Sequence, residues 1–387
     1  MHMTKLQRYS IGGIGVLALL GLLLVGLTGR SSVHAASVAP KANGTWTLTG
    51  SMTIRLWNHT AVLLNNGNVL VVGGDNDSKF HNVSHRIAQL YDPTTGTWSL
   101  TGRMNVARDG NTETLLSNGQ VLVAGGYDSK HNPTTSAELY NPTTGKWTLT
   151  GSLNIARADQ LATLLSNGEV LVIGGYDSKH NPTTSAELYN PTTGKWTLTG
   201  SMHKARQEFT ATLLNNGKVL VVGGFQDNPS QILASAELYD PTTGKWTFTA
   251  SMHYPRTGQT ATLLNNGKVL VAGGISGNVI TPTSELYDPT AGKWTLTGSL
   301  NIVRYNDTAT LLNDGRVLVA GGYSNRGQIV ASAELYDPST GKWILAGHMH
   351  YARTGQTATL LANGQVLIAG GVTDLNKPAT ATAELFS

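Results

Sequence analysis

Cysteine is absent from the 387-residue sequence. Its absence excludes disulfides, thiol catalysis and thiolate metal sites, and it leaves export from the cell permissible. Charged residues are also scarce, at 13% of the chain, and no polybasic run or RNA-binding signature is present. Nucleic acid is therefore not expected as a partner. The abundant residue is glycine, with 45 copies, which suits many short strands joined by tight turns.

The first 36 residues differ in composition from the rest of the chain. Lys5 and Arg8 precede an apolar run over residues 11–27, and a stretch of small residues ends at Ala35. This pattern predicts a signal peptide in residues 1–36. The alternative is an uncleaved membrane anchor, because the run is about as long as the shortest membrane-spanning helix, roughly 17 residues. The chain is therefore expected to be secreted or extracellular at the cell surface, or anchored in the membrane by this helix.

A unit of 48 to 52 residues repeats along the chain after that segment, and each copy carries one Gly-Gly pair and one tryptophan. The pairs begin at Gly73, Gly125, Gly174, Gly223, Gly273, Gly321 and Gly370. The tryptophans are Trp46, Trp98, Trp147, Trp196, Trp246, Trp294 and Trp343. Seven copies at a nearly fixed period indicate a repeat architecture, which makes residues 37–387 one domain rather than two or three.

One copy shows why each unit is expected to form four antiparallel strands. Residues 262–264 lead into Asn266-Gly267, which predicts a type I′ hairpin turn to the next strand, residues 269–272. That run is apolar throughout, which is typical of a strand covered on both faces. Beyond the Gly-Gly pair, residues 284–287 predict a third strand, and Lys293 opens a fourth. We call these strands a to d in chain order.

A hydrophobic strand, a Gly-Gly pair, and then a tyrosine and a tryptophan separated by a turn make up the kelch signature. The unit resembles kelch repeats from Trp46 to Phe386, in the bacterial, galactose-oxidase-like branch of that family. The resemblance implies an all-β fold, a seven-bladed β-propeller of four-stranded antiparallel blades. The copper radical site of that branch depends on a tyrosine cross-linked to cysteine. Because this chain has no cysteine, the resemblance covers the repeat and not a copper radical oxidase.

The two ends of the repeat region complete each other. The stretch TWTLTGSM, which begins at Thr45, matches strand d of the other copies, whereas residues 383–386 match strand c and have no strand d after them. We therefore predict that residues 46–50 pair as the outermost strand of the seventh blade and close the ring. The closed propeller is expected to be a monomer.

Function in a propeller is expected where the loops converge. The b-to-c and d-to-a loops emerge on one face, which we call the top. An arginine recurs in every d-to-a loop. These arginines are Arg55, Arg108, Arg157, Arg206, Arg256, Arg304 and Arg353. They either form a ring that binds an anionic ligand or pair with the glutamates of strand c as part of the scaffold. The first blade has Gln89 in the glutamate column, so one arginine near it is predicted to lack an acidic partner and to meet the ligand.

The positions that follow the arginine vary between copies. Aligned to the following strand, the third position after the arginine holds His59, Asn111, Gln160, Phe209, Gln259, Asp307 and Gln356. The position before it holds Asn58, Asp159, Glu208 and Asn306 in four of the copies. Asp109 and Tyr305 stand one residue earlier still. A variable polar column beside a uniform scaffold indicates either a specific rim or solvent-facing drift. Trp57 is the one tryptophan outside the repeat register, and it lies in the only d-to-a loop that has an extra residue. Its indole is expected either to contact a sugar or partner or to plug the channel.

Aspartate and histidine occur together in the first three b-to-c loops. Such residues can bind a divalent metal, but their spacing matches no known ligand motif, and turn formation after Gly-Gly explains the aspartates. The residues are Asp77 and His81, Asp128 and His131, and Asp177 and His180. No metal site and no cofactor are therefore expected.

No nucleophile elbow, zinc motif or phosphate loop is present, so no catalytic residue is assigned. The sequence predicts an exported binding module, rather than an enzyme, for extracellular protein or glycan ligands on the top face. The candidate ligand-binding residues are Arg55, Trp57, His59, Arg108, Asp109, Arg157, Asp159, Arg206, Glu208, Arg256, Arg304, Tyr305, Asp307 and Arg353. The alternative is a carbohydrate-active enzyme of hydrolase or lyase type that uses acids such as Asp159, Glu208 and Asp307. Contact with a membrane is expected only through residues 11–27.

Overall fold

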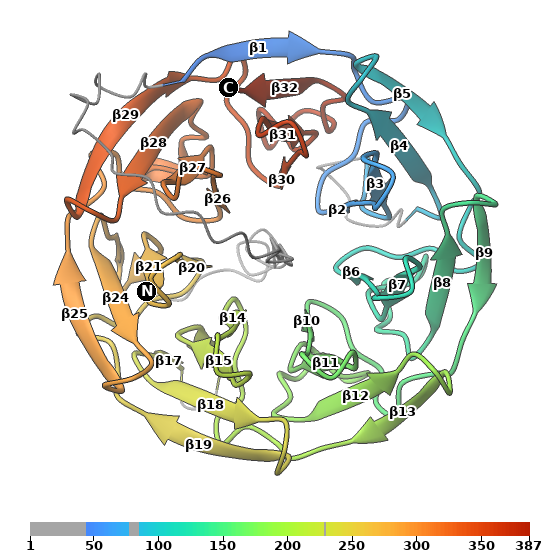
Figure 1. Ribbon diagram of the computed structural model, residues 1–387, viewed down its shortest axis with the longest axis horizontal. Helices are drawn as coiled ribbons and strands as arrows, with labels where there is room; N and C mark the ends of the chain where they lie inside the picture. The colour runs from blue at the N-terminus through green and yellow to red at the C-terminus, as the bar shows by residue number, and fades with distance from the viewer. Residues whose placement is uncertain (1–43, 77–84, 228–229) are drawn as a thin grey trace, which may run out of the picture.

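The computed structural model describes residues 44–76, 85–227 and 230–387. Seven four-stranded sheets stand around a central axis as the blades of a propeller (Figure 1). The predicted all-β fold and the number of blades are therefore confirmed. The predicted signal peptide, residues 1–36, with its apolar run, residues 11–27, lies outside the described residues. Across the part of the chain that is described, no helix is both long and apolar enough to cross a bilayer.

The blades are numbered 1 to 7 from β2. The innermost strands, a, are β2 (Thr60–Leu63), β6 (Thr112–Leu115), β10 (Leu161–Leu164), β14 (Thr210–Leu213), β20 (Thr260–Leu263), β26 (Thr308–Leu311) and β30 (Thr357–Leu360). Strands b are β3 (Val69–Val72), β7 (Val121–Ala124), β11 (Val170–Ile173), β15 (Val219–Val222), β21 (Val269–Ala272), β27 (Val317–Ala320) and β31 (Val366–Ala369).

Strands c are β4 (Ala88–Asp92), β8 (Ala137–Asn141), β12 (Ala186–Asn190), β18 (Ala236–Asp240), β24 (Ser284–Asp288), β28 (Ser332–Asp337) and β32 (Ala383–Phe386). The outermost strands, d, are β5 (Thr97–Leu100), β9 (Lys146–Leu149), β13 (Lys195–Leu198), β19 (Lys245–Thr249), β25 (Lys293–Thr297), β29 (Lys342–His348) and β1 (Trp46–Thr49). Three b-to-c loops contain short elements: β16 (Phe225–Gln226) with β17 (Gln231–Ile232), β22 (Ile275–Ser276) with β23 (Val279–Ile280), and the 3₁₀ turn η1 (Asn325–Gly327).

The ring closes as the sequence predicts, because β1 is the outer strand of blade 7. It pairs antiparallel with β32 and sets Trp46 opposite Phe386. The two rings pack with their centroids 5.0 Å apart, and the Trp46 indole N–H donates to the carbonyl oxygen of Ala346 in blade 6 at 2.8 Å. Figure 1 shows β1 outside β32, so that the two ends of the propeller share one sheet. This pairing joins the first and last blades without a break.

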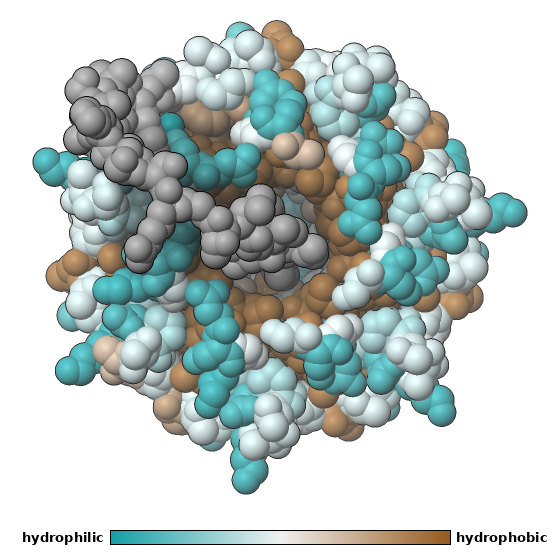
Figure 2. All heavy atoms as spheres, viewed as in Figure 1, coloured by the Kyte–Doolittle hydropathy of each residue, from teal (hydrophilic) through white to brown (hydrophobic). Residues whose placement is uncertain are grey.

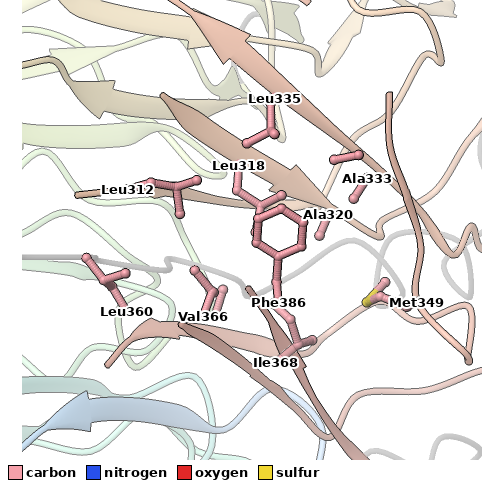
Figure 3. Packing of buried hydrophobic residues seen from close by; sticks show 12 residues of the cluster. Leu312, Leu318, Ala320, Ala333, Leu335, Met349, Leu360, Val366, Ile368 and Phe386 are labelled. Atoms are coloured by element: carbon pink, nitrogen blue, oxygen red, sulfur yellow. The ribbon is translucent and has the colours of Figure 1, made fainter. Parts of the chain in front are cut away.

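Apolar side chains between neighbouring blades form the core. All seven b strands are fully buried, as the uninterrupted apolar runs predict. Between blades 6 and 7, Leu318 and Leu335 lie across from Ile368 and Phe386 (Figure 3). The molecule is hollowed at its centre, and hydrophobic residues gather around the opening (Figure 2). The burial of apolar side chains between neighbouring blades is the main contribution that stabilises each blade against the next.

The a-to-b turns differ in detail from the predicted type I′ hairpin. Gly267 has a φ of +80°, but Asn266 is not among the residues with positive φ. Leu264 accepts a hydrogen bond from the N–H of Gly267 at 2.9 Å, and its own N–H donates to Lys268. This is a three-residue loop, a type I turn that a left-handed glycine ends. The prediction of a type I′ turn was wrong because the asparagine keeps negative φ and its side chain instead accepts from the Lys268 N–H at 3.1 Å.

Substitution at the closing seam tests how much this pairing stabilises the ring. Phe386 is 3% exposed, and Phe386→Ala is expected to lower the free energy of unfolding by about 3–5 kcal/mol, the usual loss for a buried phenylalanine. Leu48→Ala is the matched control on the facing strand, because Leu48 is 52% exposed and should cost less than about 0.5 kcal/mol. Denaturant unfolding measures both changes. Equal small effects would contradict the closure described here.

Candidate functional site

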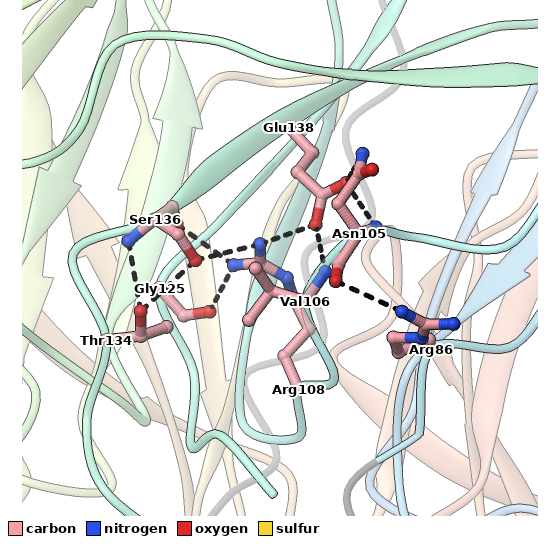
Figure 4. A network of polar contacts seen from close by, with 8 residues as sticks. All are labelled: Arg86, Asn105, Val106, Arg108, Gly125, Thr134, Ser136 and Glu138. Carbon is pink, nitrogen blue, oxygen red and sulfur yellow. Dashed lines mark hydrogen bonds and ion pairs between the residues drawn. The ribbon is translucent and has the colours of Figure 1, made fainter.

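Each of blades 2 to 7 contains a buried arginine that joins its d-to-a loop to strands b and c. Arg108 is fully buried, and its Nη1 donates to the Gly125 carbonyl at 2.8 Å and to the Ser136 carbonyl at 2.9 Å. Its Nη2 donates to Glu138 Oε1 at 2.9 Å. The same carboxylate accepts the backbone N–H of Asn105 at 2.7 Å (Figure 4). The ion pair therefore fixes the path of the loop that leads to the channel.

The other blades repeat this contact. The pairs are Arg157 with Glu187, Arg206 with Glu237, Arg256 with Glu285, Arg304 with Glu334 and Arg353 with Glu384. Both side chains of every pair are 0% exposed. Of the two roles that the sequence left open for these arginines, the structure places them in the scaffold. Their guanidinium groups do not line the surface of the top face.

Arg55 does not belong to this column. Leu56 occupies the arginine position of blade 1 instead. Its carbonyl oxygen accepts the Gly371 N–H, just as the Arg108 carbonyl oxygen accepts the Gly74 N–H. Leu56 is fully buried and Arg55 is exposed. The glutamate of blade 1 is also replaced, and Gln89 exchanges two hydrogen bonds of 2.9 Å with the backbone of Ile54. Blade 1 therefore lacks both members of the buried pair, and Arg55 is an exposed residue outside the scaffold. That this arginine meets the ligand stays a prediction.

Trp57 is a packing residue of the channel wall. With Leu56 aligned to the arginines, the loop before Trp57 has no extra residue, which corrects the sequence interpretation. The indole is 5% exposed and packs against Val372 and Ala379. It also lies over Gly355, where a Cβ would stand 3.2 Å from the ring. The structure therefore places the indole in the core, with little surface left for a sugar or a partner.

The third residue after the arginine position is buried between blades in every copy. Gln160, Gln259 and Gln356 donate to a strand b carbonyl of the preceding blade at 2.8 to 3.1 Å. His59 Nε2 lies 3.2 Å from the Thr357 hydroxyl of blade 7. Asp307 stands in the same column, but its carboxylate has no hydrogen-bond partner from another described residue. This column ties the blades together and does not form an exposed rim.

The second residue after the arginine position forms the channel mouth, and all seven have left-handed backbone. We call these residues the left-handed ring: Asn58, Gly110, Asp159, Glu208, Gly258, Asn306 and Gly355, with φ between 51° and 67°. Backbone hydrogen bonds join neighbours in the ring, such as Asp159 N–H to the Gly110 carbonyl at 2.8 Å and Asn306 N–H to the Gly258 carbonyl at 3.0 Å. Glycine adopts this conformation without strain, whereas glutamate rarely does. Four polar side chains are therefore held at the axis against local backbone preference.

Three carboxylates from consecutive blades lie near this mouth. We call Asp109, Asp159 and Glu208 the acidic sector. Asp109 precedes the left-handed ring in blade 2, and its pKa is raised well above the usual range by burial and by the charges of Asp159 and Asp75. Asp159 lies against Gly110 and accepts from the Tyr127 hydroxyl at 3.2 Å. Glu208 accepts from the Thr257 hydroxyl at 3.0 Å.

Burial shifts several titratable groups near the axis. It raises the pKa of Asp159 to about 6, of Asp307 to about 7 and of Glu208 to about 8. It lowers the pKa of His59 to about 4. These carboxyl groups can therefore exchange protons near neutral pH, which carboxyl groups at an ordinary surface do not do.

Sequence reasoning missed Glu113, which lies on strand β6 in the channel wall. Burial raises the pKa of its carboxyl group to about 8. The same position is alanine in the other blades: Ala61, Ala162, Ala211, Ala261, Ala309 and Ala358. Alignment of the inner strands alone would have shown this exception. Tyr127 was also missed, because its role depends on the contact with Asp159 in the next blade.

The b-to-c loops show the turn-forming role that the sequence favoured for their aspartates. Asp128 Oδ1 accepts the N–H groups of Lys130 and Asn132 at 2.8 and 2.9 Å, and Asp177 repeats this in blade 3. Asp77 and His81 lie outside the described residues. Among the residues that the structure describes, no group of three or more histidine, aspartate or glutamate side chains is placed to hold a metal ion.

Blade 1 provides a natural template for testing the buried ion pair. Arg157→Leu alone leaves the Glu187 carboxylate buried without its partner and is expected to cost about 3–5 kcal/mol of unfolding free energy. The double variant Arg157→Leu/Glu187→Gln reproduces the Leu56 and Gln89 combination and should recover more than half of that loss. Denaturant unfolding of the two single variants and the double variant gives the coupling. Strictly additive effects would contradict the pairing.

The raised pKa values predict that stability falls as pH rises from about 6 to about 8.5. The folded protein holds protons on Glu208 and Glu113 up to about pH 8, while the unfolded chain loses them near pH 4.5, so the stabilisation present at low pH is lost through the folded pKa. The folded pKa of His59 is lowered instead, so its contribution makes stability rise with pH, but only below its unfolded pKa of about 6.5.

Glu208→Gln should therefore raise the melting temperature at about pH 8.5 and change it little at about pH 4, because only below the unfolded pKa of 4.5 do both states hold the proton, and a protonated carboxyl group resembles an amide. Glu169→Gln, in the bottom turn of blade 3, is the matched control. Equal changes at the two pH values would show that Glu208 does not titrate in this range.

The comparisons with known proteins agree with the fold. The kelch family model described as "KLHDC2/KLHL20/DRC7 Kelch-repeats domain" matches residues 58–274 and 161–371. A solved structure of a novel fungal alcohol oxidase of the AA5 family, in complex with copper, superposes with a TM-score of 0.71 at 20% sequence identity, over 89% of this chain and 76% of that one. No curated protein matches the chain significantly. Since the two family matches together cover residues 58–371, the chain belongs to the kelch-repeat family.

Proposed function

We propose that this kelch propeller is an exported or cell-surface binding module that recognises an extracellular protein or glycan at its top face. The left-handed ring carries this proposal. Gly110, Gly258 and Gly355 show that glycine satisfies the scaffold at these positions, yet Asp159 and Glu208 hold polar side chains there. Each such residue costs of order 1 kcal/mol in backbone strain. Strain of this kind at a converging set of loops is typical of a recognition site.

The burial of the surrounding residues also supports a ligand site at the channel mouth. The recurring arginines, Trp57 and the column of His59 and Gln160 are internal, so they hold the blades and loops in place. Asp159, Glu208, Asn58 and Asn306 remain half-buried at the axis, where a ligand entering the mouth would reach them. The scaffold and the proposed contact residues are therefore adjacent in the chain and distinct in role.

An enzyme is the second candidate, because carboxyl groups that titrate near neutral pH are suited to general acid and base catalysis. Asp159, with its pKa raised to about 6, and Glu208, with its pKa raised to about 8, would then act on a glycan. Turnover of a glycoside that Asp159→Asn or Glu208→Gln alone abolishes would select this candidate. Binding without turnover would select the binding module.

Glycine substitution separates binding from stability. Asp159→Gly and Glu208→Gly remove the side chains and relieve the left-handed backbone, so both variants should keep the melting temperature within about 3 °C of the unsubstituted chain. Binding on a glycan array, or in a pull-down of extracellular proteins, should fall at least about tenfold. Glu169→Gly in a bottom turn is the control for binding. Unchanged binding in both ring variants would refute the proposed site.

A further inference from the structure

Among the residues that the structure describes, no lysine or arginine forms an ion pair with Asp109, Asp159 or Glu208. Asp109 is 7% exposed, and its Oδ1 has no hydrogen-bond partner from another described residue. A buried carboxylate without a partner is costly, and such a group in a folded protein calls for an explanation. The six arginines that reach this level of the ring each pair with a glutamate, so they do not compensate the sector.

The three carboxyl groups of the sector are electrostatically coupled through Asp159. Asp109 is close enough to Asp159 for its charge to raise the Asp109 pKa, and Glu208 responds to Asp159 in the same way. The chain supplies them from blades 2, 3 and 4, which are consecutive around the axis. Because Asp159 lies against Gly110, beside Asp109, and occupies the same ring position as Glu208 in the next blade, the sector offers several neighbouring acceptors to a donor with several N–H groups.

Aromatic rings lie beside the same carboxyl groups. Tyr127 donates its hydroxyl to Asp159, and its ring stacks on that of His131 with centroids 4.2 Å apart. Tyr305 is near enough to Glu208 for the carboxylate to raise the tyrosine pKa, after the larger effect of burial. Tyrosine faces beside carboxylates favour a cationic head group with an alkyl chain.

We infer that the channel mouth binds an alkylammonium group, whose N–H donors Asp109, Asp159 and Glu208 accept. This inference rests on the proposed function and names the ligand chemistry of that site. An ammonium group has three donors and forms N–H···O contacts of about 2.7–3.2 Å. A divalent metal needs ligands within about 2.6 Å or less, a convergence that the described residues do not provide. The ammonium group belongs either to a lysine side chain of a protein ligand or to a small amine such as an amino sugar.

Binding of a cation is linked to proton release. Among the described residues, Asp75 lies near Asp109, Tyr127 donates to Asp159, and Tyr305 and Thr257 lie near Glu208. Behind them, Tyr176 lies near Tyr127, and His85, whose pKa burial lowers, lies near Asp75. Burial keeps these carboxyl groups partly protonated near neutral pH. A bound ammonium group favours their ionised form, so protons leave as the ligand enters.

Titration calorimetry on the full chain with 1,5-diaminopentane tests the inference. We expect saturable binding at about pH 7, with an enthalpy that differs between two buffers of unequal ionisation enthalpy because protons are released. Asp109→Asn, Asp159→Asn and Glu208→Gln should each weaken binding about tenfold or more, as loss of a charge-assisted hydrogen bond predicts. Glu169→Gln should bind as the unsubstituted chain does, and 1,5-pentanediol should not bind.

Further ligands distinguish the source of the ammonium group. A lysine-containing peptide that loses binding when its lysine is acetylated indicates a protein ligand, whereas glucosamine that binds where N-acetylglucosamine does not indicates an amino sugar. Circular dichroism and melting temperatures verify that each variant folds. If Glu208→Gln does not fold, Glu208→Gly takes its place, since glycine suits the left-handed backbone there.

Several outcomes would overturn the inference. They are absence of diamine binding at millimolar concentration, equal binding by the sector variants, and displacement of the diamine by Ca²⁺ at lower concentration. If a neutral glycan or protein still binds through Asp159 and Glu208, the inferred ammonium ligand is wrong, but the proposed function as a binding module is retained. If the ring variants change the binding of no ligand at all, the proposed function fails as well.

Discussion

The buried arginine–glutamate pair is the contact on which the geometry of the propeller mouth depends. In blade 2 it joins the d-to-a loop, the Gly-Gly turn and strand c through Arg108, Gly125 and Glu138. An ion pair of this kind gains little net stability against an apolar replacement, but loss of one partner is costly because the other charge stays buried. Its main effect here is to fix where the loop crosses the inner end of the blade.

Because the arginine fixes the path of the d-to-a loop, each of the next three residues has an equivalent position from blade to blade. The first residue pairs with the strand after Gly-Gly, as Asp109 does with Tyr127. The second belongs to the left-handed ring, and the third ties its blade to the preceding one. Blade 1 retains this arrangement with different chemistry, since Leu56 packs in the core and the Gln89 amide binds the loop backbone. The scaffold therefore tolerates loss of the charges when both change together.

The distribution of charge around the axis is uneven. Blades 2 to 4 contribute Asp109, Glu113, Asp159 and Glu208, and blade 6 contributes Asp307, whereas blades 2, 5 and 7 have glycine in the left-handed ring. This difference between blades is the basis on which we propose a ligand contact at the mouth. Likeness to a copper-bound oxidase at 20% identity shows the shared fold alone. The mouth of this chain is defined instead by carboxylates and tyrosines.

The sequence by itself determined the repeat, the number of blades and the closure through β1, because these follow from short-range turn and strand signals that recur seven times. It also allowed the scaffold role of six arginines, since each of these has a glutamate 29 to 31 residues further along the chain. The spacing from Trp46 also places Leu56, not Arg55, at the arginine position, although comparison of residue types alone does not show it. Tertiary structure alone decided that Trp57 is internal. It also decided which carboxylates converge, as Asp109, Asp159 and Glu208 are about 50 residues apart. Such choices depend on how neighbouring blades pack around the axis, which no local pattern specifies.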